Sequence, residues 1–202
     1  AQLKKDYFPA PNLVVNVSVP SGNYGNLTAG LIAKRMGLQI DHFIAAANAN
    51  NSFPKYLETG SYSPQPSIAT LSNAMDVGNP SNVRRIDSLY DSDSRKMSSD
   101  ITGASLSDQD CLQTIDQVYK QYKYMLDPHG AIGYKALSMV PKKGINIILE
   151  TAHPIKFKEV VEAVIPDQVH MPSHIQVNTK DENIISLSNE YSNFKEYLIS
   201  SR

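Results

Sequence analysis

Three short apolar runs along the chain predict the strands of a sheet. Residues 13–19 hold one leucine and four valines, and residues 42–47 and 145–149 are apolar at nearly every position. Runs without a polar face are typical of strands that are buried on both sides, as in a parallel sheet. We therefore expect each run to form a buried strand of a mostly parallel sheet.

Segments with helical periodicity lie between these strands and after the last of them. They cover residues 26–36, 107–122, 128–140, 154–163 and 188–199, and a short helix is expected over residues 52–57. Ser107 fits an N-cap before two acidic residues, and Pro128 suits a first helical turn. Residues 59–82 are rich in Gly, Ser, Pro and Asn, which predicts a long loop, and residues 91–110 are expected to form a solvated connection.

Strands that alternate with helices predict an α/β fold. We expect a single three-layer domain over residues 1–202, with a mostly parallel sheet and helices on both faces. Three strands are few for this architecture. Either further strands escape the apolar pattern, or part of the sheet belongs to another segment.

Composition narrows the function classes. The 202 residues include 19 Lys and Arg and 20 Asp and Glu, for a net charge of −1. This balance argues against nucleic-acid binding, which needs a basic face. No apolar run is long enough to span a membrane, and the start of the chain lacks the apolar core of a secretion signal. A single Cys excludes an internal disulfide and fits a cytoplasmic protein.

The hexamer between the first strand and its helix is the most informative segment. It reads Ser-Gly-Asn-Tyr-Gly-Asn over residues 21–26. Backbone N–H groups at a helix start lack internal partners and carry the positive end of the helix dipole. Gly22 and Gly25 let a ligand approach the backbone and permit positive φ. These features predict a phosphate-type anion site, while the nucleotide fingerprints GxGxxG and GxxxxGK[ST] are absent. A glycine-rich turn without a ligand is the alternative.

The same hexamer resembles the phosphate-binding loop of threonine synthase, a family of pyridoxal-phosphate enzymes of fold type II. Further segments resemble this family in the same order: residues 27–38, 43–48, 70–77, 127–134 and 151–157. The family's proteins are longer, and this chain resembles their C-terminal half. The resemblance implies an enzyme that converts O-phospho-L-homoserine and water to L-threonine and phosphate with pyridoxal 5'-phosphate.

The resemblance also implies a set of cofactor contacts. The loop residues that would hold the cofactor phosphate are Gly22, Asn23, Tyr24, Gly25 and Asn26. The hydroxyl of Thr151 would meet the pyridine nitrogen. If the resemblance is left aside, an alternative role for Thr151 is the N-cap of the helix that follows Pro154.

No catalytic residue is expected in this chain, because the family's Schiff-base lysine lies upstream of the matched segment. The expected partners are therefore the missing N-terminal half and the substrate O-phosphohomoserine. Lys158 imitates the context of that lysine but falls near the solvent border of its helix. Lys34 lies two turns beyond the loop, and Lys142 and Lys143 precede the last strand, at the opposite end of the sheet.

Other reactive side chains favour structural roles. His129 and His153 lie in turns and are expected to make structural hydrogen bonds, and Cys111 lies on an apolar helix stripe. His170 and His174 are four residues apart, but a proline between them argues against a shared helix face. We therefore predict no metal site.

Two rival functions stay open. One is another lyase of fold type II, such as a dehydratase, although the segments at residues 70–77 and 151–157 argue against it. The other is a non-catalytic domain of the same fold that binds an anion or a partner.

Overall fold

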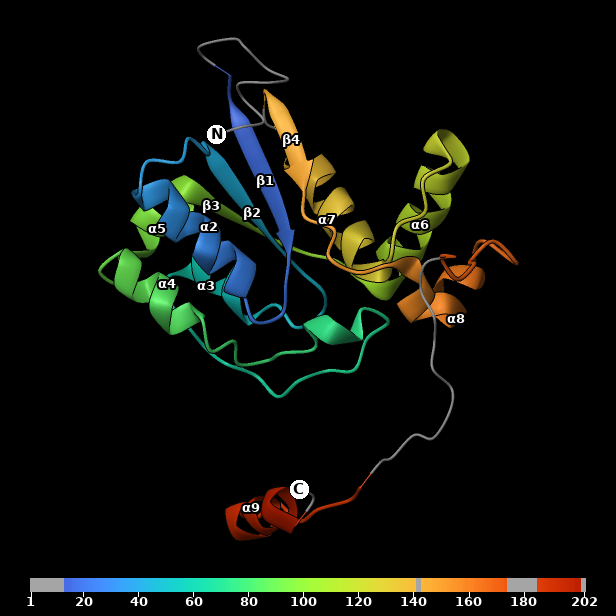
Figure 1. Cartoon of the computed structure of the whole chain (residues 1–202). Coiled ribbons are helices and arrows are strands. Elements are labelled where there is room, and N and C mark those ends of the chain that lie inside the picture. Colours follow the sequence, from blue (N-terminus) through green and yellow to red (C-terminus); the bar gives the residue numbers. More distant parts are fainter. Residues whose placement is uncertain (1–12, 141–142, 174–184, 201–202) are drawn as a thin grey trace. The chain divides into compact units, whose positions relative to one another are not determined.

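The computed structural model describes residues 13–140, 143–173 and 185–200. The chain divides into two compact units, Ala1–His170 and Met171–Arg202. The strands described in the first unit are β1 (Val15–Pro20), β2 (His42–Ala47), β3 (Ile101–Ser105) and β4 (Ile145–Ile148). All their pairings are parallel, in the order β3-β2-β1-β4 (Figure 1). The predicted parallel sheet is confirmed.

The central and edge strands of this sheet differ in burial. Every residue of β1 and of β2 is buried, as their apolar runs predict. The strand predicted over residues 145–149 is present as β4, but none of its residues is fully buried, so the predicted burial is wrong. Within the described part of the chain, β4 pairs only with β1. Its outer edge therefore lacks a partner strand, and such an edge stays partly open to solvent.

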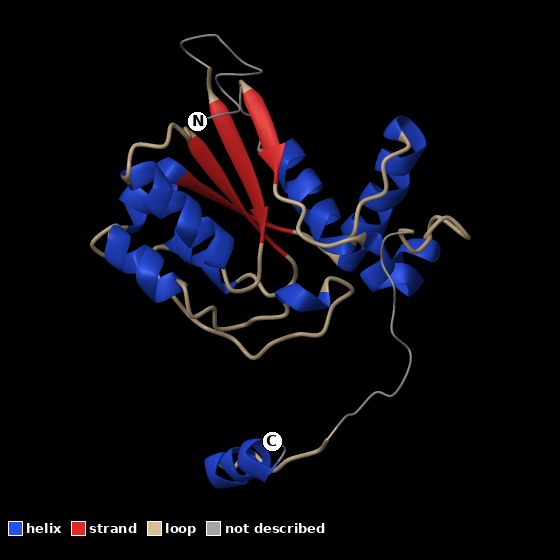
Figure 2. Ribbon diagram, viewed as in Figure 1, coloured by secondary structure: helices blue, strands red, loops and turns tan. Residues whose placement is uncertain are grey.

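Helices cover both faces of the sheet (Figure 2). In β2, Phe43 and Ala45 belong to one apolar cluster, and Ile44 and Ala46 belong to the other. Successive side chains of a strand point to opposite faces, so each cluster lies on its own face. Side chains of the first cluster come from α2 (Gly25–Arg35), α3 (Ser52–Thr59), α4 (Val83–Leu89) and α5 (Ser94–Asp100). Those of the second come from α6 (Asp108–Tyr122), α7 (Pro128–Met139) and α8 (Lys158–Glu162). The predicted three-layer α/β fold is confirmed.

The segment predicted to be a solvated connection, residues 91–110, contains α5 and β3 instead, and that prediction is wrong. β3 escapes the apolar pattern because it reads Ile-Thr-Gly-Ala-Ser. Its small residues reflect a tight contact with α3. A Cβ atom placed on Gly103 would lie 2.7 Å from the Cα atom of Pro54. A larger side chain at this position would push the helix off the strand.

The predicted helix starts agree with the structure. Ser107 and Asp110 form a reciprocal capping box at the start of α6. The side chain of Asp127 caps α7, and Pro128 occupies its first turn. After β4, a 3₁₀ helix, η2 (Pro154–Phe157), leads into α8.

The second unit contains one described helix, α9 (Tyr191–Ser200), close to the helix predicted over residues 188–199. Its described side chains are not buried. None of the helices among the described residues is both long enough and apolar enough to cross a membrane.

Candidate functional site

The loop between β1 and α2 is tied down at both ends. The N–H of Ser21 donates to the carbonyl of Ala46 on β2, at 3.1 Å. The hydroxyl of Ser21 accepts from the N–H of Tyr24 at 2.7 Å. At the start of α2, the hydroxyl of Thr28 donates to the carbonyl of Tyr24 at 2.8 Å. These bonds hold Tyr24 in the left-handed region, with φ of 56°.

Four amides of this loop are free to bind a ligand. The N–H groups of Gly22, Asn23, Gly25 and Asn26 have no hydrogen-bond partner among the described residues. Gly25 and Asn26 open an 11-residue helix and are exposed. Unpaired amides at the positive end of a helix dipole are the donor set that a phosphate group requires. The residues present therefore fit the phosphate of the implied cofactor.

The structure accounts differently for the glycines at positions 22 and 25 of the loop. Neither has a positive φ, and the residue with a positive φ is Tyr24. A Cβ atom on Gly22 would lie 2.7 Å from both the Cα and the carbonyl oxygen of Met75. A Cβ atom on Gly25 would meet only the side-chain amide nitrogen of Asn82, at 3.8 Å. Gly22 is thus required by packing, whereas Gly25 leaves open space beside the free amides.

The side chains of Asn23 and Tyr24 brace the loop. The Oδ1 atom of Asn23 accepts from the N–H of Ser81 at 2.6 Å and from its hydroxyl at 3.0 Å. The side chain of Asn82 donates to the carbonyl of Asn23 at 2.9 Å. The ring of Tyr24 is fully buried, 4.7 Å from the ring of Phe53 between centroids, and burial raises the pKa of its hydroxyl far above the usual value. The N–H of Tyr24 is already bonded to the hydroxyl of Ser21, so it is not among the unpaired amides of the loop.

Sequence reasoning did not connect the loop at residues 59–82 with the phosphate-type loop. In the structure its short 3₁₀ helix η1 (Asn73–Met75) reaches Gly22, and Ser81 and Asn82 reach Asn23. The segment at residues 70–77 carried a signal, since it resembles the threonine synthase family. The resemblance did not indicate which residues of the fold this segment contacts.

Thr151 and this loop both lie at the carboxyl ends of the strands. Ser18 on β1 pairs with Ile148 on β4, and Ser21 and Thr151 each follow three residues later. Ligands of parallel sheets bind beyond the carboxyl ends of the strands, where both residues lie. The alternative role of Thr151 as an N-cap is wrong, because His153 caps η2 by accepting the N–H of Ile155 at 3.1 Å. The Thr151 hydroxyl is exposed and has no partner within the described residues.

A pocket of about 600 Å³ lies beside Thr151. Its lining includes Glu150 and His153. The carboxylate of Glu150 accepts from the hydroxyl of Tyr124 at 2.6 Å and from the N–H of Asp127 at 3.2 Å. Burial raises the pKa of Glu150 above its ordinary value. Thr151 is among the residues that line this pocket, whereas none of the loop residues 22–26 lines it.

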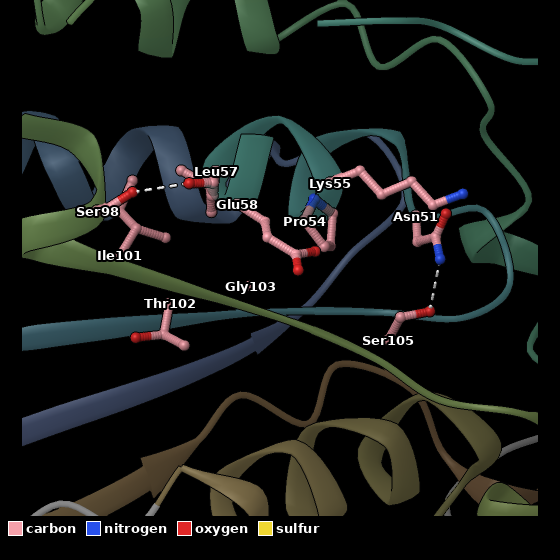
Figure 3. A pocket seen from close by; sticks show the side chains of 10 residues that line it. All are labelled: Asn51, Pro54, Lys55, Leu57, Glu58, Ser98, Ile101, Thr102, Gly103 and Ser105. Atoms are coloured by element: carbon pink, nitrogen blue, oxygen red, sulfur yellow. Dashed lines mark hydrogen bonds between the residues drawn. The ribbon is translucent and has the colours of Figure 1, made fainter. Parts of the chain in front are cut away.

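A second pocket, of about 530 Å³, lies between α3 and β3 (Figure 3). Figure 3 shows Lys55 and Glu58 on the helix and Thr102 and Ser105 on the strand. None of the residues implied to contact the cofactor lines this pocket. It does not contribute to the candidate site.

The remaining reactive side chains have the structural roles predicted for them. The Nδ1 atom of His129 lies 2.6 Å from the carboxylate of Asp127, the cap of α7. Cys111 is 1% exposed, and its thiol donates to the carbonyl of Pro128 at 3.3 Å. Burial, together with the nearby carboxylates of Asp108 and Asp127, raises the pKa of Cys111 to about 12. Its thiol is therefore a poor nucleophile.

The described residues contain no group of three or more His, Cys, Asp or Glu side chains that could hold a metal ion. The pair predicted not to form a metal face is only partly described. His170 lies in the described part of the chain, and His174 lies outside it.

The lysines considered as Schiff-base partners lie elsewhere or outside the described residues. The ammonium of Lys34 pairs with Asp100 at 2.9 Å and donates to the carbonyl of Asp41, next to the start of β2. Lys158 is exposed and pairs with Glu162 at 3.6 Å. Lys143 is exposed before the start of β4, and Lys142 lies outside the described residues. Lys34 and Lys143 are thus at the end of the sheet opposite the loop.

Sequence comparison with known proteins finds threonine synthases. A family profile described as "Threonine synthase, C-terminal" matches residues 130–198. A threonine synthase from Haemophilus influenzae is 40% identical over 207 aligned residues, which cover 100% of this chain and 46% of that protein. The chain thus spans less than half the length of this relative.

Solved structures agree with the sequence matches. The crystal structure of threonine synthase from Escherichia coli matches with a TM-score of 0.77 and 35% identity, over 96% of this chain and 46% of that one. A pyridoxal-phosphate-bound threonine synthase from Brucella melitensis matches with a TM-score of 0.76 and 30% identity, over 81% of this chain and 41% of that one. Over its whole length, the chain therefore matches the C-terminal portion of threonine synthases.

Proposed function

We propose that this chain is the C-terminal part of a threonine synthase that converts O-phospho-L-homoserine and water to L-threonine and phosphate with pyridoxal 5'-phosphate. One observation carries the proposal in this structure. Four unpaired loop amides lie at the end of β1, and the unpaired hydroxyl of Thr151 lies at the end of the neighbouring strand. The two ends of an elongated, phosphate-bearing pyridine ring require these two kinds of group.

In this proposal the loop amides of Gly22, Asn23, Gly25 and Asn26 hold the cofactor phosphate, and Tyr24 fixes the loop from beneath. Thr151 meets the ring nitrogen through a neutral hydroxyl, which does not force that nitrogen to carry a proton, as a carboxylate would. When bound, pyridoxal phosphate supplies an electrophile that makes the α-hydrogen of the amino acid acidic. The chain's own part is to orient the ring by gripping its two ends.

The Schiff-base lysine and part of the substrate site belong, in this proposal, to an upstream half of the enzyme. A Schiff-base lysine needs an amine beside the cofactor's aldehyde carbon and an environment that favours its neutral form. The ammonium groups of Lys34 and Lys158 are instead paired with the carboxylates of Asp100 and Glu162. The enzyme would act in the cytoplasm, in agreement with the single Cys.

The experiment compares the 202-residue chain with a chimaera that joins it to the upstream part of the Haemophilus influenzae relative. Each protein is incubated with pyridoxal phosphate and reduced with borohydride, and the modified lysines are mapped by mass spectrometry. We expect scattered, substoichiometric labelling of the chain alone and no phosphate release from O-phosphohomoserine. The chimaera is expected to label one upstream lysine and to release phosphate. Stoichiometric labelling of a single lysine in the chain alone, with turnover, would contradict the proposal.

Two variants of the chimaera test the ring-nitrogen contact. Thr151→Val removes the hydroxyl and is expected to lower kcat about tenfold, the upper end for one neutral hydrogen bond. Thr151→Ser keeps the hydroxyl and is the matched control, expected to retain most of the activity. Equal activity of the two variants would remove Thr151 from the site.

A further inference from the structure

Asp76 ties the loop at residues 59–82 to the end of β2. Its Oδ1 atom accepts from the side-chain amides of Asn48 at 2.8 Å and Asn50 at 3.1 Å, and from the hydroxyl of Thr70 at 2.7 Å. Its Oδ2 atom accepts from the N–H of Thr70 at 2.9 Å. One carboxylate therefore gathers four donors from two segments of the chain. Hydrogen bonds to an ionised acceptor are stronger than neutral ones.

The two asparagines that donate to Asp76 are buried. Asn48 is 1% exposed and Asn50 is 4% exposed, directly after β2. Asn50 also bonds the backbone of Ile68 twice: its amide donates to the carbonyl at 2.8 Å, and its Oδ1 atom accepts from the N–H at 2.7 Å. The amides of Asn48 and Asn50 also donate to other groups, such as the hydroxyl of Ser72 and the carbonyl of Ile68. The N–H of Thr70 has only the carboxylate as its partner among the described residues, so removing the carboxylate would leave this donor without a hydrogen bond.

The segment that Asp76 anchors lies against the phosphate-type loop. Met75, its direct neighbour, is 2% exposed and packs its backbone against Gly22. Further along the same segment, Ser81 donates its N–H to the side chain of Asn23 at 2.6 Å. Gly22 and Asn23 contribute two of the four free amides. The position of these amides thus depends on a segment that is held by Asp76.

We propose that Asp76 is a positioning residue for the anion-binding loop. Its carboxylate anchors residues 68–82 to β2, and this segment in turn holds Gly22 and Asn23 with their amides open to a phosphate group. The effect of Asp76 on anion binding rests on the proposed function. Its effect on the position of residues 68–82 and of the loop does not.

The experiment measures amide hydrogen exchange by NMR in the 202-residue chain. Asp76→Asn keeps Oδ1 for three donors but turns an NH₂ group toward the N–H of Thr70. The N–H of Thr70 is expected to exchange at least about tenfold faster, the effect of one lost charge-assisted bond. The N–H of Ser81, which is bonded to Asn23 and not to Asp76, is expected to exchange faster as well. A local role would change Thr70 alone.

The matched control is Asp87→Asn. Asp87 also accepts from two hydroxyls, those of Tyr56 and Ser92, and neither partner belongs to the phosphate-type loop. This variant is expected to leave the exchange of Ser81 unchanged. Thr70→Val is the second variant, and it decides the question where Asp76→Asn does not fold. It keeps the carboxylate but removes the hydroxyl that donates to Asp76 and accepts from the amide of Asn48. It is expected to speed the exchange of Ser81 several-fold.

Titration with inorganic phosphate separates this inference from the proposed function. In the wild-type chain, phosphate is expected to shift the amide signals of Gly22, Asn23, Gly25 and Asn26, and Asp76→Asn is expected to weaken binding at least about tenfold. Absence of these shifts in the wild type contradicts the anion site but leaves the exchange test valid. Unchanged exchange of Ser81 in both Asp76→Asn and Thr70→Val overturns the positioning role.

Discussion

Gly22→Ala is the substitution whose effect the structure defines most closely. The new Cβ atom would lie 2.7 Å from the Cα atom and the carbonyl oxygen of Met75, and 2.8 Å from its carbonyl carbon. Non-bonded carbon atoms prefer a separation of about 3.5–4.0 Å, so one of the two backbones must move by most of an ångström. All three clashing atoms are backbone, and a change of rotamer cannot relieve the contact.

The expected cost follows from known effects of overpacking. Extra methyl groups in a close-packed site cost about 1–3 kcal/mol of unfolding free energy. For a domain of this size, each kcal/mol lowers Tm by about 2–4 °C, so a decrease of roughly 2–12 °C is expected. The shift of the loop also moves the amide of Gly22, and phosphate binding is expected to weaken.

Gly25→Ala is the matched control, because both substitutions add one methyl group to the same loop. Its Cβ atom would find only the side-chain nitrogen of Asn82 within 4 Å, and its φ is not positive. Alanine at this first helical position is expected to raise the unfolding free energy by about 0.5–1 kcal/mol. The new methyl group occupies the space beside the free amides, so phosphate binding is nevertheless expected to weaken.

The assay is thermal unfolding of both variants and the wild type, followed by circular dichroism, together with phosphate titration by NMR. A decrease in stability for Gly22→Ala with no decrease for Gly25→Ala would support the different roles of the two glycines. A Gly22→Ala protein as stable as the wild type would show that Met75 does not pack against the loop. The packing argument would then be refuted.

Two further predictions concern buried groups. The Tyr24 hydroxyl is buried without a partner among the described residues. Tyr24→Phe is therefore expected to raise the unfolding free energy in urea by about 1 kcal/mol, and a decrease would reveal a bound partner. The pKa of Cys111 is raised to about 12, whereas an unfolded thiol titrates near 8.5. Between these values the unfolded chain loses its proton first, so stability falls as pH rises, and in Cys111→Ala the slope is expected to be shallower by up to about 1.4 kcal/mol per pH unit. Equal slopes would contradict the raised pKa.

The sequence alone predicts the elements that form the centre of the fold. β1 and β2 are buried on both faces, so their apolar runs carry no competing polar pattern. The start of α6 is predicted from Ser107 and the acidic residues after it, because an N-cap bonds to amides only two or three residues further along the chain. The boundaries of these elements depend on local chemistry.

β3, α4 and α5 could not be predicted in this way. β3 carries small residues because α3 packs on Gly103, and this contact joins residues that are far apart in the sequence. α4 buries only Val83 and Ile86, and α5 buries only Met97. Such short helices bury too few side chains to leave a periodic pattern, and packing stabilises them more than their own propensity does.

For the candidate site too, the sequence predicts one part and the tertiary structure determines the other. The glycines and the helix start after β1 are visible in the sequence, because the amides of a helix start lack partners in any context. Only the tertiary structure decided that Gly22 is required by the backbone of Met75, and that Asn23 is bonded to Ser81. The path of residues 59–82 determines both contacts. That path depends on hydrogen bonds to the end of β2, which no local pattern in the loop specifies.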